Sequence, residues 1–85
     1  MLYYDNKESG ERIKELRKGK KVTQEVAAYD LGISTDGYRN LEQGKNGASI
    51  ITLMEMAQYF NTTIDYIVTG RNCVVVEDED RNIVN

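Results

Sequence analysis

Residues 23–44 carry the local signals for two short helices joined by a tight turn. Thr23 and Ser34 stand where the helices would begin, and their side chains can accept hydrogen bonds from free amides of the first helical turn. Leu31-Gly32-Ile33 supplies the turn between the helices. Gly44 is suited to end the second helix, because glycine adopts a left-handed backbone conformation without strain. This stretch therefore requires two short helices to pack closely around one turn.

The second of these helices has separate apolar and polar sides. Tyr38 and Leu41, three positions apart, can both pack inward. A polar stripe with Thr35 at its edge is formed by Asp36, Arg39, Asn40 and Gln43. Most of these side-chain types can hydrogen-bond base edges in the major groove of DNA. An isolated polar stripe is more typical of a solvated helix face. Here, however, two short helices around a glycine turn have the outline of a helix-turn-helix, and this context favours the interpretation that the stripe reads DNA.

The segment before Thr23 predicts one further helix. Residues 1–8 are polar apart from an N-terminal stretch with two tyrosines, and they are expected to form a loose lead-in. From about Ser9, the spacing of Ile13 and Leu16 with charges between them predicts an amphipathic helix that ends near Lys18. Gly19 would then stop this helix.

Two more helices are expected after Gly44. Ser49 can cap the first, whose inward face is predicted to consist of Ile50, Leu53, Met56, Ala57 and Phe60. Ile51 and Met54 fall off this face, and they are either ordinary exposed residues or covered by the tail or a second subunit. Thr63 can cap a short last helix over residues 64–69, with Ile64 and Ile67 inward.

The acidic C-terminal tail, residues 71–85, has a different composition. Three consecutive valines favour a strand, and the run Glu77–Asp80 could turn so that Ile83 and Val84 pair back as a hairpin. An isolated hairpin is only marginally stable, so docking on the domain or pairing across a dimer would be needed. The alternative is a frayed chain end.

Charge is distributed unevenly along the chain. The net charge of −3 differs from the basic surplus usual among nucleic-acid-binding proteins. The run Glu77–Asp80 accounts for the negative net charge, and the rest of the chain is close to neutral. Six basic residues crowd one short segment: Arg12, Lys14, Arg17, Lys18, Lys20 and Lys21. A local basic patch is sufficient for contacts with phosphates.

Several functional classes are disfavoured by residue content. The chain has no histidine, and its single cysteine, Cys73, has no neighbouring base. No carboxylates have metal-ligand spacing apart from the solvated run Glu77–Asp80, so neither an enzyme, a metal site nor a cofactor is expected. No apolar run approaches the roughly 20 residues that span a bilayer. The N-terminal sequence does not resemble a secretory leader, and a lone cysteine fits a reducing compartment, so a cytoplasmic location is expected.

Five segments resemble, in order and spacing, the Cro/phage-repressor (XRE-like) family of helix-turn-helix regulators. They are Gly10–Arg17, Thr23–Ala28, Leu31–Ser34, Tyr38–Gly44 and Leu53–Ala57, and the run Phe60–Gly70 continues the match. The resemblance covers roughly residues 10–70. It implies an all-α, compact five-helix lambda-repressor-like domain over residues 9–70, in which the helix after Ser34 enters the major groove.

The same resemblance assigns roles to individual residues. Base reading would fall to Thr35, Asp36, Arg39 and Asn40. The DNA phosphates would be contacted by Gln24, Ser34, Gln43, Lys45 and Asn46, which set register and carry little sequence information. A structural ion pair between Arg17 and Glu42 would tie the first helix to the third.

Three positions depart from the family pattern or from helix propensity. Gly37 costs about 1 kcal/mol of helix propensity relative to alanine, and either allows close approach to DNA or is tolerated by packing. Asp36 repels phosphates, so it either accepts a hydrogen bond from a cytosine amino group or caps the helix N-terminus. Ala48 replaces a proline common in the family, which affects the rigidity of that loop.

The resemblance implies sequence-specific binding of double-stranded DNA by a small transcriptional regulator. The leading hypothesis is a repressor that binds a palindromic operator as a homodimer. The alternative is a protein-interaction module, such as the antitoxin of a toxin–antitoxin pair, whose acidic tail binds a basic protein partner. No membrane association is expected.

Overall fold

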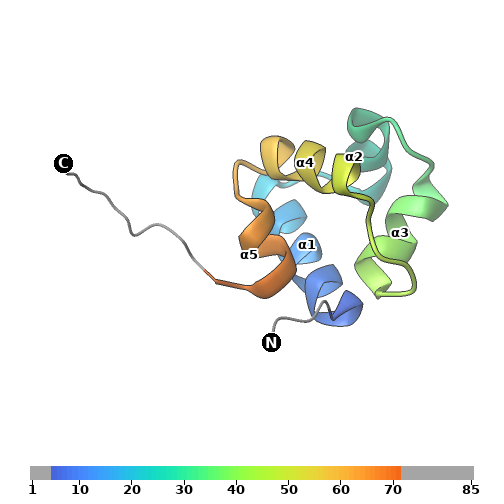
Figure 1. The fold of residues 1–85 in the computed structure, drawn as a ribbon. Helices are drawn as coiled ribbons and strands as arrows, with labels where there is room; N and C mark the ends of the chain where they lie inside the picture. The colour runs from blue at the N-terminus through green and yellow to red at the C-terminus, as the bar shows by residue number, and fades with distance from the viewer. Residues whose placement is uncertain (1–4, 72–85) are drawn as a thin grey trace.

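The protein is an arrangement of five α-helices, seen in a computed structural model that describes residues 5–71 (Figure 1). The helices are α1 (Asn6–Lys20), α2 (Gln24–Leu31), α3 (Thr35–Gln43), α4 (Ile50–Tyr59) and α5 (Ile64–Thr69). This confirms the predicted all-α, five-helix fold. Three predictions concern residues 72–85, which lie outside the described residues. They are the strand or hairpin of the tail, its dimerising role and its protein partner. None of the described helices is both long enough and apolar enough to cross a membrane.

The predicted N-terminal caps of α2 to α5 are all present. Each cap is a serine or threonine whose hydroxyl accepts a hydrogen bond from an amide in the first turn, and the four are Thr23, Ser34, Ser49 and Thr63. Gly32, Gly44 and Gly70 follow the ends of α2, α3 and α5 with positive φ, as expected for glycine in this position. Local capping signals therefore set most of the helix boundaries.

The bounds predicted for α1 are wrong at both ends. The helix begins at Asn6 instead of near Ser9, because the Asp5 carboxylate accepts hydrogen bonds from the amides of Lys7 and Glu8. It also continues through Gly19 to Lys20. The left-handed residue that ends it is Lys21, whose amide donates to carbonyls of the last turn. The N-terminal lead-in is therefore shorter than residues 1–8.

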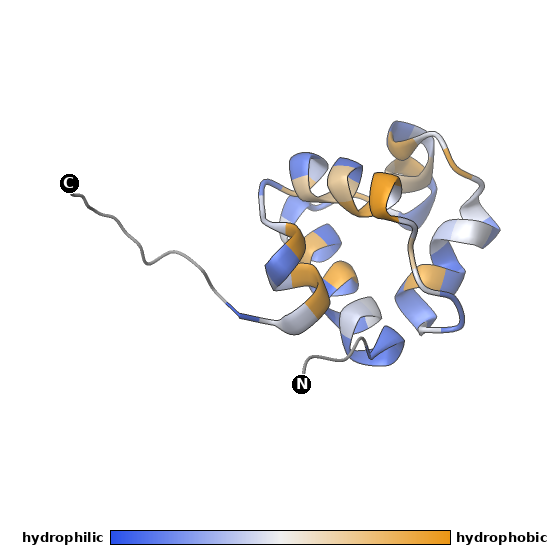
Figure 2. Ribbon diagram, in the orientation of Figure 1, coloured by the Kyte–Doolittle hydropathy of each residue, from blue (hydrophilic) through white to orange (hydrophobic). Residues whose placement is uncertain are grey.

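The hydrophobic core lies among all five helices, and Figure 2 shows apolar segments of the helices turned toward one another. The predicted inward residues of α4 are buried except for Ile50, whose surface is 62% exposed. Ile50 is the first residue of α4, directly after the cap, and lies beyond the edge of the core. Ile51 and Met54 are also exposed, as the helical spacing predicted. Ile67 is fully buried, and Ile64 packs against the core.

Close contact between α1 and α3 depends on a glycine. A Cβ atom at Gly10 would lie 2.5 Å from the carbonyl oxygens of Leu41 and Glu42. Glycine at this position therefore allows α1 to pack directly against the C-terminal half of α3. α2 also packs against α3, and α3 lies at the edge of the domain away from α5 (Figure 1). The packing leaves one side of α3 uncovered.

Candidate nucleic-acid interface

The α2–turn–α3 unit has a defined connecting geometry. α2 ends at Gly32, whose φ of 74° places it in the left-handed region, and Ile33 packs against the core. Ser34 then caps α3 by accepting a hydrogen bond from the Gly37 amide at 2.9 Å. A Cβ atom at Gly37 would lie 3.0 Å from this same hydroxyl. The turn thus fixes the direction in which α3 leaves α2.

Buried side chains hold α3 from behind. Tyr38 is fully buried and Leu41 nearly so, as their spacing predicted. Glu42 is also buried, and it is one of the two buried polar residues among the described part of the chain. Anchoring on one side therefore orients the opposite side of α3 toward solvent.

The predicted base-reading residues all lie on α3, from its first residue to Asn40. Asp36 is exposed, and Thr35, Arg39 and Asn40 are partly exposed. The predicted phosphate-contacting residues are divided between two places. Ser34 lies at the start of α3, and Gln24 lies at the start of α2. The others are exposed at the C-terminal end of α3 and in the following loop: Gln43, Lys45 and Asn46.

The ion pair between Arg17 and Glu42 is present and almost buried. Arg17 Nε donates to Glu42 Oε2 at 2.6 Å, and the exposed fractions of the two side chains are 13% and 2%. Arg17 Nη1 also donates to the carbonyl of Val22 at 3.0 Å. Burial alone would raise the pKa of Glu42, but the hydrogen bonds and positive charge at this carboxylate lower it overall. Glu42 is therefore held as a carboxylate that joins α1 to α3.

The buried hydroxyl of Tyr38 lies near this ion pair. Burial and the neighbouring Glu42 carboxylate raise the pKa of Tyr38 far above its ordinary value. The hydroxyl makes no hydrogen bond of ordinary geometry. Tyr38 consequently remains neutral and acts as part of the core.

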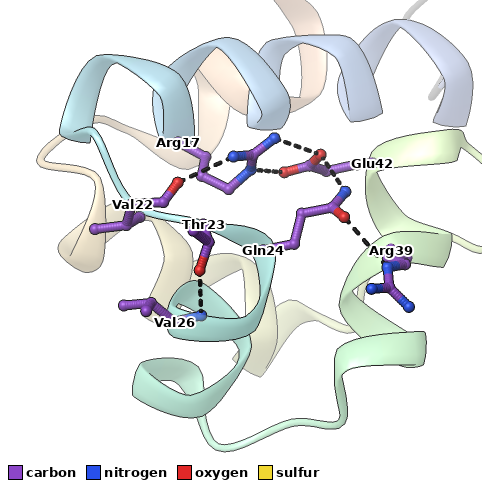
Figure 3. Close-up of polar contacts among 7 residues, drawn as sticks. All are labelled: Arg17, Val22, Thr23, Gln24, Val26, Arg39 and Glu42. Carbon is purple, nitrogen blue, oxygen red and sulfur yellow. Dashed lines mark hydrogen bonds and ion pairs between the residues drawn. The ribbon is translucent and has the colours of Figure 1, made fainter.

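The side-chain amide of Gln24 connects the ion pair to Arg39 (Figure 3). Gln24 Nε2 donates to Glu42 Oε1 at 2.9 Å, and Gln24 Oε1 accepts from Arg39 Nε at 3.2 Å. The residue expected to contact a phosphate is thus already engaged within the protein. Its amide nitrogen keeps a second N–H, because the Glu42 bond uses only one.

Arg39 has two further acceptors besides Gln24. Nη1 donates to Asp36 Oδ1 at 3.4 Å, and Nη2 donates to Glu25 Oε2 at 3.1 Å. The role of Glu25 was missed by sequence reasoning, because the two residues are 14 positions apart and no helical periodicity relates them. Asp36 is not the N-cap of α3, which is Ser34, although it does lie in the first turn.

Two arginines of the basic segment are used inside the domain. Arg12 donates from Nε and Nη2 to the carbonyls of Ile67 and Val68 at the end of α5. Arg17 is occupied by Glu42 and Val22. The lysines of the basic segment are exposed, whereas Arg12 and Arg17 are partly buried. Within residues 5–71, no group of three or more potential ligand side chains is arranged to hold a metal ion.

Residues 13–67 match the family model described as helix-turn-helix. An uncharacterized HTH-type transcriptional regulator of Bacillus subtilis (strain 168), YqaE, is 33% identical over 88% of this chain and 66% of its own length. The HTH-type transcriptional activator BcrR of Enterococcus faecalis is 32% identical over 88% of this chain and 37% of its own length. This chain therefore spans just under two thirds of the first relative and little more than a third of the second.

A solved structure gives an independent comparison of the fold. The P22 c2 repressor protein, crystallised in complex with synthetic operator 9T in the presence of Tl+, aligns with a TM-score of 0.71. The alignment covers 74% of this chain and 96% of that one, at 24% sequence identity. This likeness extends the agreement from local motifs to the arrangement of the helices.

Proposed function

This chain belongs to the Cro/phage-repressor (XRE-like) family of helix-turn-helix transcriptional regulators, and from that premise we propose that it binds double-stranded DNA sequence-specifically. α3 is the proposed recognition helix. The observation that carries the proposal is the position of Arg39 and Asn40 on the partly exposed side of α3, while Tyr38 and Leu41 anchor its other side. A helix held in this way can enter the major groove with its polar side chains directed at base edges.

Phosphate contacts would fix the position of α3 on the duplex. Gln24 begins α2, where free amides and the positive end of the helix dipole favour an anion. The second N–H of its side-chain amide remains for a phosphate oxygen. Lys45 and Asn46 are exposed just beyond the other end of α3. Gln24 on one side of the recognition helix, and Lys45 with Asn46 on the other, would therefore bind the DNA backbone.

We further propose that the protein acts as a homodimer on a palindromic site. A single domain of this size buries little DNA surface, and two copies on half-sites one helical turn apart would double the contact. Ile50, Ile51 and Met54 give α4 an exposed apolar surface that a second copy could cover. Repression is the proposed outcome, because a bound dimer needs only to occupy a promoter.

Selection from a pool of random duplex DNA tests this function. The expected result is an enriched inverted repeat whose half-sites are centred about 10 base pairs apart. Enrichment of a single, unrepeated half-site would contradict the dimer. Recovery of no preferred sequence would contradict sequence-specific binding. A reporter gene whose promoter carries the selected site should then be transcribed less when the protein is present. Increased transcription would contradict repression.

A further inference from the structure

The guanidinium of Arg39 is held by side chains from two helices. Asp36 belongs to the same helix as Arg39 and contacts it across one turn, as expected for neighbours three positions apart. Gln24 and Glu25 belong to α2 and approach the guanidinium from the preceding helix. Their hydrogen bonds therefore fix the position of Arg39 relative to the helix-turn-helix as a whole.

We propose that Glu25 is a positioning residue that sets the base preference of this surface by orienting Arg39. The proposal rests on the proposed DNA binding, and it assigns to Glu25 no contact with DNA. Glu25 Oε2 accepts from Arg39 Nη2 at 3.1 Å, while Gln24 holds Nε on the same side chain. Two acceptors on α2 together restrict rotation of the guanidinium plane more than one acceptor on α2 would.

The donors that remain on Arg39 are suitable for reading a base. Each of its three nitrogens makes one hydrogen bond within the protein. One N–H is left on Nη1 and another on Nη2, because each terminal nitrogen carries two. A pair of such donors can bridge the N7 and O6 acceptors of guanine. Fixing the guanidinium plane fixes where this pair of donors meets the groove.

Glu25 would oppose DNA binding if it acted by charge alone. It lies in the first turn of α2, and 63% of its side chain is exposed. A carboxylate beside the expected phosphate position repels DNA of every sequence. Charge and positioning therefore predict different effects on affinity and on discrimination, and two substitutions separate them.

The experiment compares Glu25→Gln with Glu25→Ala. The probes are the duplex selected by the wild-type protein, its single-base variants and a scrambled duplex. Glutamine keeps an acceptor oxygen for Arg39 but loses the charge, whereas alanine loses both. Both variants should bind the scrambled duplex more tightly than wild type. Glu25→Ala should lower discrimination at one base pair by about two- to five-fold, and Glu25→Gln should retain most of it.

Three controls connect this effect to Arg39. In an Arg39→Ala background, Glu25→Ala should cause no further loss of discrimination. Glu55→Gln, which removes an exposed carboxylate from α4, should leave discrimination unchanged. In the free protein, the NMR signal of the Arg39 Nε–H should change its shift and exchange faster with water in Glu25→Ala.

Distinct outcomes overturn the positioning role and the proposed DNA binding. If wild type discriminates but both Glu25 variants lose discrimination equally, or neither loses it, the positioning role is wrong while DNA reading stands. An additional loss in the Arg39→Ala background, or an unchanged Arg39 signal, also overturns it. If wild type binds selected and scrambled duplexes alike, the proposed DNA reading fails, and the role of Glu25 fails with it.

Discussion

Arg17 Nε and Glu42 Oε2 lie 2.6 Å apart and join α1 to α3 through a nearly buried ion pair. The carboxylate accepts a second hydrogen bond from Gln24, whose own oxygen accepts from Arg39. A continuous chain of hydrogen bonds thus runs from the first helix to the exposed side of α3. We infer that stability and the placement of Arg39 depend on the same carboxylate.

Removing one partner of this pair should destabilise the domain strongly. Arg17→Met leaves the Glu42 carboxylate buried with only Gln24 as a strong donor, and we expect a loss of about 3–5 kcal/mol in the free energy of unfolding. Urea denaturation followed by circular dichroism measures this loss. The double variant Arg17→Met/Glu42→Leu should recover much of it, because no uncompensated charge remains. Equal stability of the single and double variants would contradict this explanation.

The buried carboxylate should also make stability depend on pH. The pKa of Glu42 is lowered in the folded state, so the unfolded chain takes up the proton first as the pH falls. The stabilising contribution is therefore complete above the ordinary glutamate pKa of 4.5 and is lost as the pH falls below it. Urea unfolding between pH 7 and about pH 3 should show a flatter dependence for Glu42→Gln than for wild type. Parallel curves would contradict this assignment.

Two glycines on α1 should respond in opposite ways to the same substitution. A Cβ atom at Gly10 would clash with backbone carbonyls of α3, whereas one at Gly19 would meet no atom within 4 Å. Gly10→Ala should therefore lower the melting temperature markedly, because the contact is with backbone that cannot move aside. Gly19→Ala should stabilise the domain by about 0.5–1 kcal/mol, the usual benefit of alanine over glycine in a helix. A neutral Gly10→Ala would show that α1 and α3 are not in close contact.

Lys45 should contribute affinity without contributing specificity. It lies beyond the end of α3, where it can reach a phosphate but is displaced from the base-reading residues. Lys45→Ala should weaken binding to selected and scrambled duplexes by the same factor and reduce the salt dependence of binding by about one counterion. Titrations at several salt concentrations measure both quantities. A change confined to the selected duplex would assign Lys45 to base reading instead.

Capping and turn residues made much of the fold predictable from sequence. Serine, threonine and glycine act over one helical turn, so the starts of α2 to α5 followed from local chemistry. The start of α1 was missed because residues 1–8, which include Asp5, show no helical periodicity. The exposure of Ile50 was missed because periodicity indicates a direction around a helix and not the distance from the core.

The candidate site was predictable to a smaller extent. The polar side of α3 is visible as a stripe at helical spacing, and the ion pair of Arg17 with Glu42 was implied by family resemblance. The hydrogen bonds from Arg39 to Gln24 and Glu25 join different helices. Their existence depends on the angle at which α2 meets α3, which no local pattern of residues specifies.

The effect of Arg39→Ala on base discrimination tests DNA reading by α3 most directly. Binding of the wild-type and variant proteins to the selected duplex and its single-base variants should be compared at physiological salt. We predict that the variant loses its preference at one base pair, at a cost of about 1–3 kcal/mol, while the preferences at other positions remain. If Arg39→Ala binds the selected duplex as tightly and as selectively as wild type, α3 does not read DNA through Arg39.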